Sequence, residues 1–231
     1  MHASRRSNRT RKNSLLITHG SDELTGLTLK ACLIARDATF NLLDFLRKSS
    51  RMAFLAIRDC EKELDQIERY IDEHMPAAIT QVSEPKARQL LSSLKAITDL
   101  ERIGDLVLGV AQRLQSRPEL LARSAVEGLG QMTALVHDML EQIHEGFVSP
   151  DIKCARKVLR ADADIDRIYR SLFKEGLSGS TVQQDPLLFE ILLMAQALER
   201  AGDHATNLAE ELVSLIEGHT ARHPPKRKTS P

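Results

Sequence analysis

The sequence has no tryptophan, and aromatic residues make up only 3% of its 231 positions. Sheets favour aromatic and β-branched side chains, so this scarcity argues against a β-rich core. Leu, Ala, Ile, Glu and Arg dominate the long periodic stretches instead. That composition is typical of packed amphipathic helices, and we predict an all-α protein.

Cysteine is also scarce, with Cys32, Cys60 and Cys154 widely spaced and no CxxC motif. This spacing argues against a disulfide framework and against a thiolate zinc site, so we expect small buried side chains in a reducing compartment. No apolar run approaches the ~18 residues of a membrane span, and no apolar segment follows the basic N-terminus as in a secretory signal. We therefore predict a cytoplasmic protein without membrane insertion.

The formal net charge is zero, but the charges are unevenly distributed. Residues 1–12 carry five basic side chains and residues 223–231 carry three, with no acid in either segment, which leaves 24 basic and 32 acidic side chains elsewhere. Short basic ends of this kind are typically solvated. We predict flexible basic tails at 1–20 and 221–231 and no nucleic-acid partner.

A hexapeptide occurs twice, as LERIGD at 100–105 and LERAGD at 198–203, 98 residues apart. With that offset, seven of the fifteen positions from Leu100 to Leu114 are identical in the second copy. This agreement indicates two copies of one structural unit.

Six segments show apolar residues at spacings of three and four, as in helices that pack along one another. Proline, glycine and N-capping residues divide the chain so that each unit receives three helices joined by short connections. We predict tandem three-helix bundles over 21–117 and 118–220, with helices from Ser21, from Arg51 to near Pro76, from Pro85 to before Pro118, through 129–143, over 151–175, and from Pro186 to Gly218.

Each hexapeptide places a Glu and an Asp one helical turn apart, at Glu101 and Asp105 and at Glu199 and Asp203. Each carboxylate directly follows a residue of the apolar stripe, so it lies at the edge of the packing seam. The glycine inside each motif costs a helix about 1 kcal/mol relative to alanine. Its repetition suggests that another helix or a ligand approaches closely there.

The preceding helix of each unit carries a second acidic pair with the same spacing. These pairs are Glu61 with Asp65 and Asp162 with Asp166, and the segments align at Leu64–Ile67 and Ile165–Ile168. Four carboxylates then face one another twice per chain, which calls for a compensating cation such as Mg²⁺, Mn²⁺, Ca²⁺ or iron. The alternative is neutralisation in surface salt bridges by Arg102, Arg200, Arg167 and Lys62.

The segments LERIGD and LERAGDHATNLAEE, with LIEGHTARH at the end of the last helix, resemble the PhoU family of phosphate-uptake regulators over nearly all of residues 22–222. The resemblance implies two PhoU-like three-helix bundles, multinuclear metal clusters and a regulatory, non-enzymatic role. Iron, manganese, zinc or magnesium are the metals considered. The ligands implied by the motif match are Glu61, Asp65, Glu101, Asp105, Asp162, Asp166, Glu199 and Asp203.

The same resemblance implies two partners, the ATPase of a phosphate ABC transporter and a membrane sensor histidine kinase, and a homodimer. Leu42, Leu46, Leu187 and Phe189 are either core residues or a dimer surface. His204, next to Asp203, is expected to face solvent or a neighbouring unit, because consecutive helical residues point about 100° apart.

Two other functions remain open at this point. A ferritin-like oxidase also holds carboxylates inside a helical bundle, but it uses Glu-x-x-His on two helices. This sequence has one clear instance, Glu141 with His144, which we interpret as an exposed pair. A metal-free helical adaptor is the second alternative.

Overall fold

The computed structural model describes the backbone of residues 3–116, 123–178 and 186–218, and the side chains of residues 20–116, 125–174 and 187–218. The described residues form six α-helices and no strand, which confirms the predicted all-α class. The helices are α1 (Ala3–Lys48), α2 (Arg51–Ile79), α3 (Glu84–Ser116), α4 (Arg123–Val148), α5 (Ile152–Ser178) and α6 (Pro186–Glu217).

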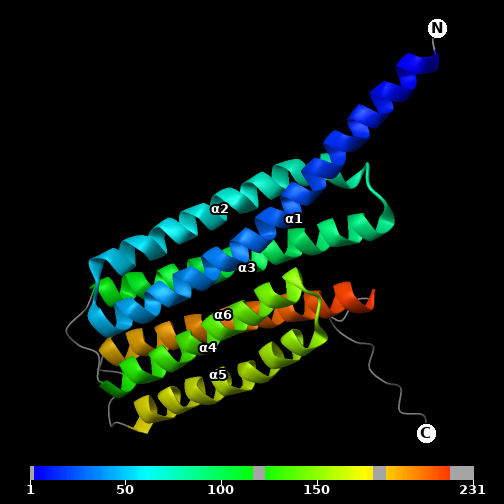
Figure 1. The fold of residues 1–231 in the computed structure, drawn as a ribbon. Helices are drawn as coiled ribbons and strands as arrows, with labels where there is room; N and C mark the ends of the chain where they lie inside the picture. The colour runs from blue at the N-terminus through cyan, green and yellow to red at the C-terminus, as the bar shows by residue number, and fades with distance from the viewer. Residues whose placement is uncertain (1–2, 117–122, 179–185, 219–231) are drawn as a thin grey trace, which may run out of the picture.

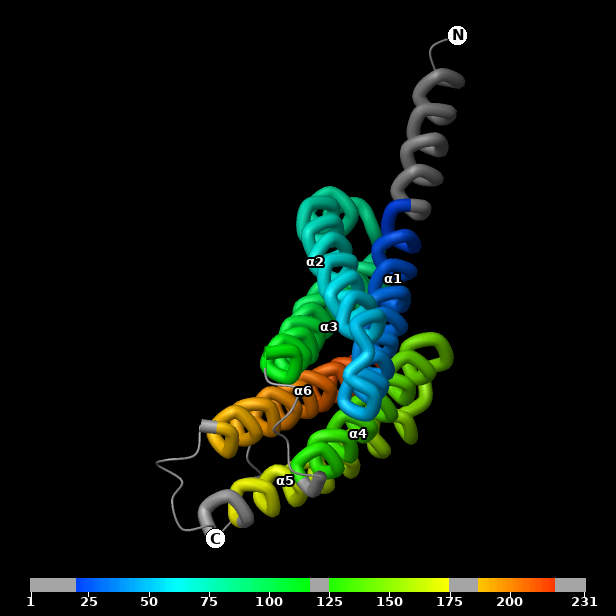
Figure 2. The backbone as a smooth tube through the Cα atoms, turned by 90° about the vertical axis from the view of Figure 1, so that its left-hand side faces the viewer, coloured from blue at the N-terminus to red at the C-terminus, as the bar shows by residue number. Residues whose placement is uncertain are grey.

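Helices α1, α2 and α3 pack against one another, as do α4, α5 and α6 (Figure 1). The two three-helix bundles meet through contacts of α1 with α4 and of α3 with α6. In the described part of the chain α2 contacts no helix beyond α1 and α3, and α5 none beyond α4 and α6. The molecule therefore has a central four-helix layer with α2 and α5 on opposite sides (Figure 2).

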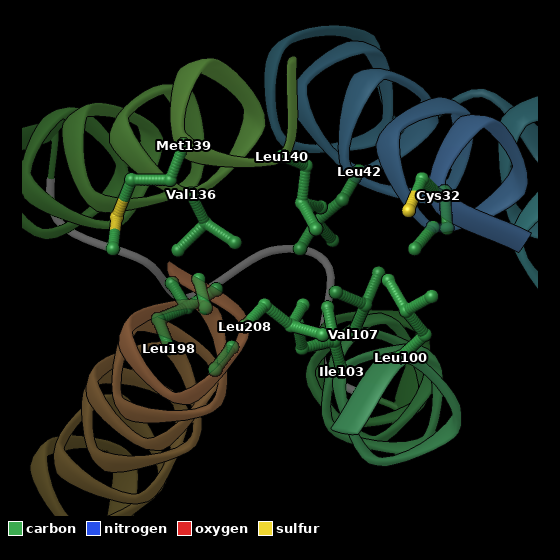
Figure 3. Close-up of a cluster of buried hydrophobic side chains, with 14 of the residues drawn as sticks. Cys32, Leu42, Leu100, Ile103, Val107, Val136, Met139, Leu140, Leu198 and Leu208 are labelled. Atoms are coloured by element: carbon green, nitrogen blue, oxygen red, sulfur yellow. The ribbon is translucent and has the colours of Figure 1, made fainter. Parts of the chain in front are cut away.

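One continuous hydrophobic cluster fills both bundles and the layer between them. Figure 3 shows side chains of α1, α3, α4 and α6 converging in this layer, among them Leu42, Leu100, Leu140 and Leu208. All four are fully buried. The apolar stripes predicted on the third and sixth helices thus face the junction of the two bundles as well as their own bundle.

Several helix ends follow the expected local chemistry. Ser50 caps α2, with its Oγ accepting a hydrogen bond from the Ala53 amide at 3.4 Å. Pro85 lies in the first turn of α3, where its missing N–H is not needed. Gly218 ends α6 with a φ of 74°, the left-handed conformation that glycine adopts easily.

Two predicted helix ends are wrong. Helix α2 continues through Pro76 to Ile79, and α5 continues through Gly176 to Ser178. Pro76 removes the hydrogen bond to the Asp72 carbonyl, but Met75 is buried and Ala78 packs against the core, so packing holds the last turn in place.

Helix α1 begins at Ala3, inside the segment 1–20 that the sequence assigned to a flexible tail. No proline or glycine precedes Gly20 to stop a helix in that segment. The side chains before Gly20 and all of residues 219–231 lie outside the described residues, so the bounds of the two tails and two bundles stay predictions.

Four apolar residues were predicted to lie either in the core or on a dimer surface, and the structure shows a different exposure for each kind. Leu42 is fully buried, and Leu46 and Leu187 pack against the core while partly exposed. Phe189 is 60% exposed. None of the described helices has the length and apolarity needed to cross a membrane.

The cysteines behave as expected of small packed side chains. Cys32 and Cys154 are buried, Cys60 is partly buried, and none of the three is in a disulfide. Burial raises the pKa of the Cys32 thiol to about 12, and burial together with Asp37, Glu63 and Asp59 raises the pKa of Cys60 to about 11. Both are therefore protonated, unreactive thiols at neutral pH.

Candidate metal centres

The glycine of each hexapeptide lies in close contact with an outer helix. A Cβ added to Gly104 on α3 would lie 2.6 Å from Leu64 Cδ1 and 3.9 Å from Glu61 Cα. A Cβ added to Gly202 on α6 would lie 2.9 Å from Ile165 Cδ1 and 3.7 Å from Asp162 Oδ1. The helix, rather than a ligand, occupies the space, and it brings the acids of α2 and α5 to the motif.

This close approach predicts opposite effects for two alanine substitutions on α3. Gly104→Ala is expected to lower the free energy of unfolding by about 1–2 kcal/mol, because its methyl group overlaps the fully buried Leu64. Gly109→Ala meets no atom within 4 Å and is expected to raise it by about 0.5–1 kcal/mol through helix propensity alone. Urea unfolding measures both, and equal effects of the two substitutions would contradict the close contact.

The four acids predicted for the second centre form one electrostatic group between α5 and α6. Burial raises the pKa of Asp162, and the negative charges of Asp203 and Asp166 raise it further. Burial likewise raises the pKa of Glu199, followed by the charges of Asp203, Asp166 and Asp162. The structure thus brings together the carboxylates that the sequence paired across two helices.

The first centre is coupled in the same way between α2 and α3. Burial and the charges of Asp105 and Asp65 raise the pKa of Glu61. Burial is the main cause that raises the pKa of Glu101 to about 7, with further contributions from Asp105 and Glu68 against the lowering effect of Arg102. The Glu101 side chain is 14% exposed, and its Oε2 is buried without a hydrogen-bond partner in the described part of the molecule.

A fifth carboxylate, Glu68, joins the first centre and was missed by the sequence analysis. Burial raises the pKa of Glu68, and the Thr98 hydroxyl opposes that rise by hydrogen bonding. The spacing of Glu61, Asp65 and Glu68 places all three on one face of α2, a signal that was available in the sequence. The aligned position of the second copy is Tyr169, so the two centres differ in charge.

Salt bridges neutralise part of each acidic group. Arg102 Nη1 lies 3.4 Å from Asp105 Oδ2, and Arg102 Nε lies 3.6 Å from Glu101 Oε2. Arg69 pairs with Asp65 at 2.8 Å and Arg170 pairs with Asp166 at 2.5 Å, from one turn further along the outer helices. Arg167, expected to neutralise the second centre, pairs with Asp164 instead at 2.7 Å.

Four of the predicted ligands form no ion pair with any described residue: Glu61, Asp162, Glu199 and Asp203. Lys62 and Arg200 lower the pKa of Glu61 and Glu199 only as the smallest influences on those groups. Half of the predicted set therefore keeps uncompensated negative charge near like charges. Salt bridges therefore neutralise only part of the negative charge of these clusters.

The donor chemistry fits a hard cation, although the oxygens are spread apart. In each cluster like charges lie near one another, and Glu101 Oε2 is a buried acceptor that no described group donates a hydrogen bond to. Their oxygens do not gather as closely as the ligand atoms of His137, Asp138 and Glu141, a ring nitrogen and two carboxylate oxygens. These residues are the one described trio with ligand atoms within 4.8 Å of one another. The predicted ligands would have to turn inward to share an ion.

Two segments of this chain match the family model of the PhoU domain, residues 29–114 and residues 129–212. The first segment begins within α1, spans all of α2 and ends within α3. The second begins within α4, spans all of α5 and ends within α6. The chain belongs to the PhoU family. The resemblance predicted from the repeated hexapeptide is confirmed.

Curated members of the PhoU family align with most of the chain. A phosphate-specific transport system accessory protein PhoU homolog from Xylella fastidiosa is 30% identical over 229 residues, covering 95% of each chain. A homolog of the same description from Rhizobium meliloti is 33% identical over 167 residues, covering 67% of this chain and 68% of its own.

Solved PhoU structures share the fold. The PhoU crystal structure from Pseudomonas aeruginosa is 25% identical, with a TM-score of 0.69 over 90% of this chain and 99% of its own. The phosphate transport system regulatory protein PhoU from Streptococcus pneumoniae superposes with a TM-score of 0.78 over 88% of this chain and 98% of its own, at 24% identity. The tandem three-helix architecture is therefore that of the PhoU family.

The second PhoU repeat carries residues that join it to the first. His204 Nδ1 lies 2.9 Å from Asp99 Oδ1, and the Asn207 side-chain amide donates to the same oxygen at 3.2 Å. Asp99 is 9% exposed and precedes Leu100 on α3. His204 thus faces the neighbouring unit, one of the two expected orientations, and its role here is to join the repeats.

The pair considered for a ferritin-like oxidase lies on α4, which contributes no residue to either acidic cluster. Glu141 is exposed and His144 is partly buried. His137, in the neighbouring trio, uses Nδ1 within 3.2 Å of Thr39 Oγ1 and 3.3 Å of the Arg36 carbonyl oxygen, and so links α4 to α1. The exposed side chain of Glu141 agrees with its interpretation as a surface residue.

Proposed function

We propose that this PhoU-family protein regulates phosphate uptake and phosphate-responsive signalling by binding other proteins. The observation that carries the proposal is the end-to-end match to phosphate-specific transport system accessory proteins, at 30% identity over 95% of both chains. Both PhoU repeats are present with the full helical architecture. A regulatory role needs no catalytic residue, and we assign none.

The partners proposed are the ATPase of a phosphate ABC transporter and a membrane sensor histidine kinase. We propose that this binding takes place in the cytoplasm. We also propose a homodimer, for which Phe189, 60% exposed on α6, offers an apolar contact. Sedimentation of the wild type against Phe189→Ser tests the dimer.

A binding experiment tests the proposed regulatory role. Tagged protein is incubated with the detergent-solubilised transporter and with the kinase of the source organism, each at low and at high phosphate. Binding to at least one of them, with an affinity that changes with phosphate, is the expected result. Failure to bind either partner at any phosphate concentration contradicts the proposal.

We further propose that each bundle binds a divalent or multinuclear metal at its acidic group. In the first, Glu68 joins Glu61, Asp65, Glu101 and Asp105. In the second, the ligands are Asp162, Asp166, Glu199 and Asp203. A bound cation supplies positive charge that removes the repulsion among the acids, and the carboxylates would tie each outer helix to its partner.

Removing two carboxylates from the second centre is expected to lower the metal content by about half, since one of two centres is lost. The change is Glu199→Ala with Asp203→Ala, and elemental analysis after loading with iron, manganese, zinc or magnesium gives the content. Asp59→Ala with Glu63→Ala is a matched control, because these acids have the same spacing and side chains 70% and 44% exposed outside both clusters. Unchanged metal content in the Glu199 and Asp203 variant rules out this centre, and a metal-free wild type favours the adaptor alternative.

A further inference from the structure

A cavity of about 450 Å³ opens at one end of the central four-helix layer. It is lined by the middle of α1, the first turns of α3, the last turns of α4 and the last turns of α6. Its volume is that of a small-molecule binding site. It shares no residue with either acidic cluster and has a different chemistry.

One wall of the cavity carries polar groups that have spare hydrogen-bonding capacity. Ser92 is 1% exposed, and its Oγ has no hydrogen-bond partner among the described residues. Lys86 Nζ donates to Asp22 Oδ1 at 2.6 Å and to Gln89 Oε1 at 3.0 Å. An ammonium group has three N–H bonds, so one donor of Lys86 is left for a ligand.

A second part of the wall is apolar. Leu29, Phe147, Leu212, Leu215 and Ile216 contribute most of it, from three different helices. The hydroxyls of Thr25 and Thr28 also line the space but donate to carbonyls of their own helix, at 3.0 and 3.1 Å. Water filling this space would find few partners along the apolar wall, whereas an alkyl chain would bury its surface there.

Charge selects the kind of ligand. Within the described part of the chain Lys86 is the one ionisable side chain in the lining, and no carboxylate contributes to it. Asp22, which pairs with Lys86, is 73% exposed and lies outside the lining. The lining thus presents the ammonium group of Lys86, which is 24% exposed, and the Ser92 hydroxyl, which has no hydrogen-bond partner among the described residues. Both groups can donate hydrogen bonds to an anion.

We propose that this cavity binds a small amphiphilic carboxylate, with its anionic group at Lys86 and Ser92 and its alkyl chain along Leu212 and Phe147. The site goes beyond the proposed regulatory role and needs no metal. It also explains the buried hydroxyl of Ser92, which otherwise loses a hydrogen bond on folding.

Calorimetric titration with decanoate below its micellar concentration tests the site, and it suits a protein that lacks tryptophan as a fluorescent reporter. Saturable binding of one decanoate per chain is expected. Lys86→Met should weaken it about five- to tenfold and Ser92→Ala about threefold, because each removes one donor to the carboxylate. Lys30→Met is the matched control, since Lys30 is 56% exposed and pairs with Glu63 away from the cavity.

Two further ligands separate the contributions of charge and chain. Decanol should bind more weakly than decanoate and equally well to the wild type and to Lys86→Met, because it keeps the chain and lacks the charge. Decyltrimethylammonium, with the charge reversed, should bind more weakly than decanol. Absence of saturable decanoate binding, or equal decanoate affinity in the wild type, Lys86→Met and Ser92→Ala, would overturn the proposal.

Discussion

Leu208→Ala is expected to lower the free energy of unfolding of the whole molecule by about 2–5 kcal/mol, the usual range for a leucine removed from a packed core. Leu208 is fully buried on α6. It points into the layer where α3, α4 and α6 converge (Figure 3). The cavity left by the substitution therefore removes packing contacts from both bundles.

The shared core also predicts the form of the transition. Because one hydrophobic cluster runs through both bundles, urea unfolding followed by circular dichroism should be a single transition, and Leu208→Ala should shift all of it. Leu91→Ala is the control, since Leu91 is 45% exposed on α3 and should change stability by less than about 1 kcal/mol. Two separate transitions, of which only one shifts, would show that the bundles unfold independently.

The helices and their buried faces could be predicted because local periodicity determines them. Leu100, Val107, Ala111 and Leu114 follow one another at spacings of seven, four and three, as on one face of a helix, and all four are buried. The internal repeat allowed the second bundle to be predicted, because the same apolar stripe recurs on the sixth helix. The end of α6 at Gly218 followed from the chemistry of one residue.

Contacts between the bundles could not be predicted, because they join residues far apart in sequence. Asp99 is buried and hydrogen-bonded to His204 and Asn207, which come from the other repeat. Glu211, 7% exposed, pairs with Lys95 across the same junction at 3.1 Å. Acids whose hydrogen-bonding or cationic partners lie on distant helices look in the sequence like any acid on a solvated face.

The acidic centres were predictable in position and only partly in composition. The offset of the two hexapeptides, with the acidic pairs on the preceding helices, gave eight carboxylates that the structure places in two coupled groups. Glu68 was missed because the alignment of the repeats favoured residues present in both copies. Arg69 pairs with Asp65 and Arg170 pairs with Asp166. Which acid a long arginine side chain reaches along the helix is not determined by spacing alone.

Glu101→Gln is expected to act in opposite directions on the metal-free and the metal-loaded protein. In the metal-free protein, burial and the neighbouring Asp105 and Glu68 raise the pKa of Glu101 from 4.5 to about 7. A carboxyl group whose pKa is higher in the folded state binds its proton more tightly there. Its contribution to stability is therefore greatest below about pH 4.5 and is lost as the pH rises to about 7.

Glutamine keeps the shape of the side chain and cannot ionise, so it removes this loss. In the presence of a chelator at pH 8, Glu101→Gln should raise the free energy of unfolding by roughly 1–3 kcal/mol and flatten its fall between about pH 4.5 and pH 7. With metal present the same substitution removes one of the proposed anionic ligands and should weaken metal binding at least about tenfold. Urea unfolding across this pH range and metal titration measure the two effects, with the 84% exposed Glu84→Gln as control. Destabilisation of the chelated protein by Glu101→Gln at pH 8 would show that the carboxylate is compensated without a metal.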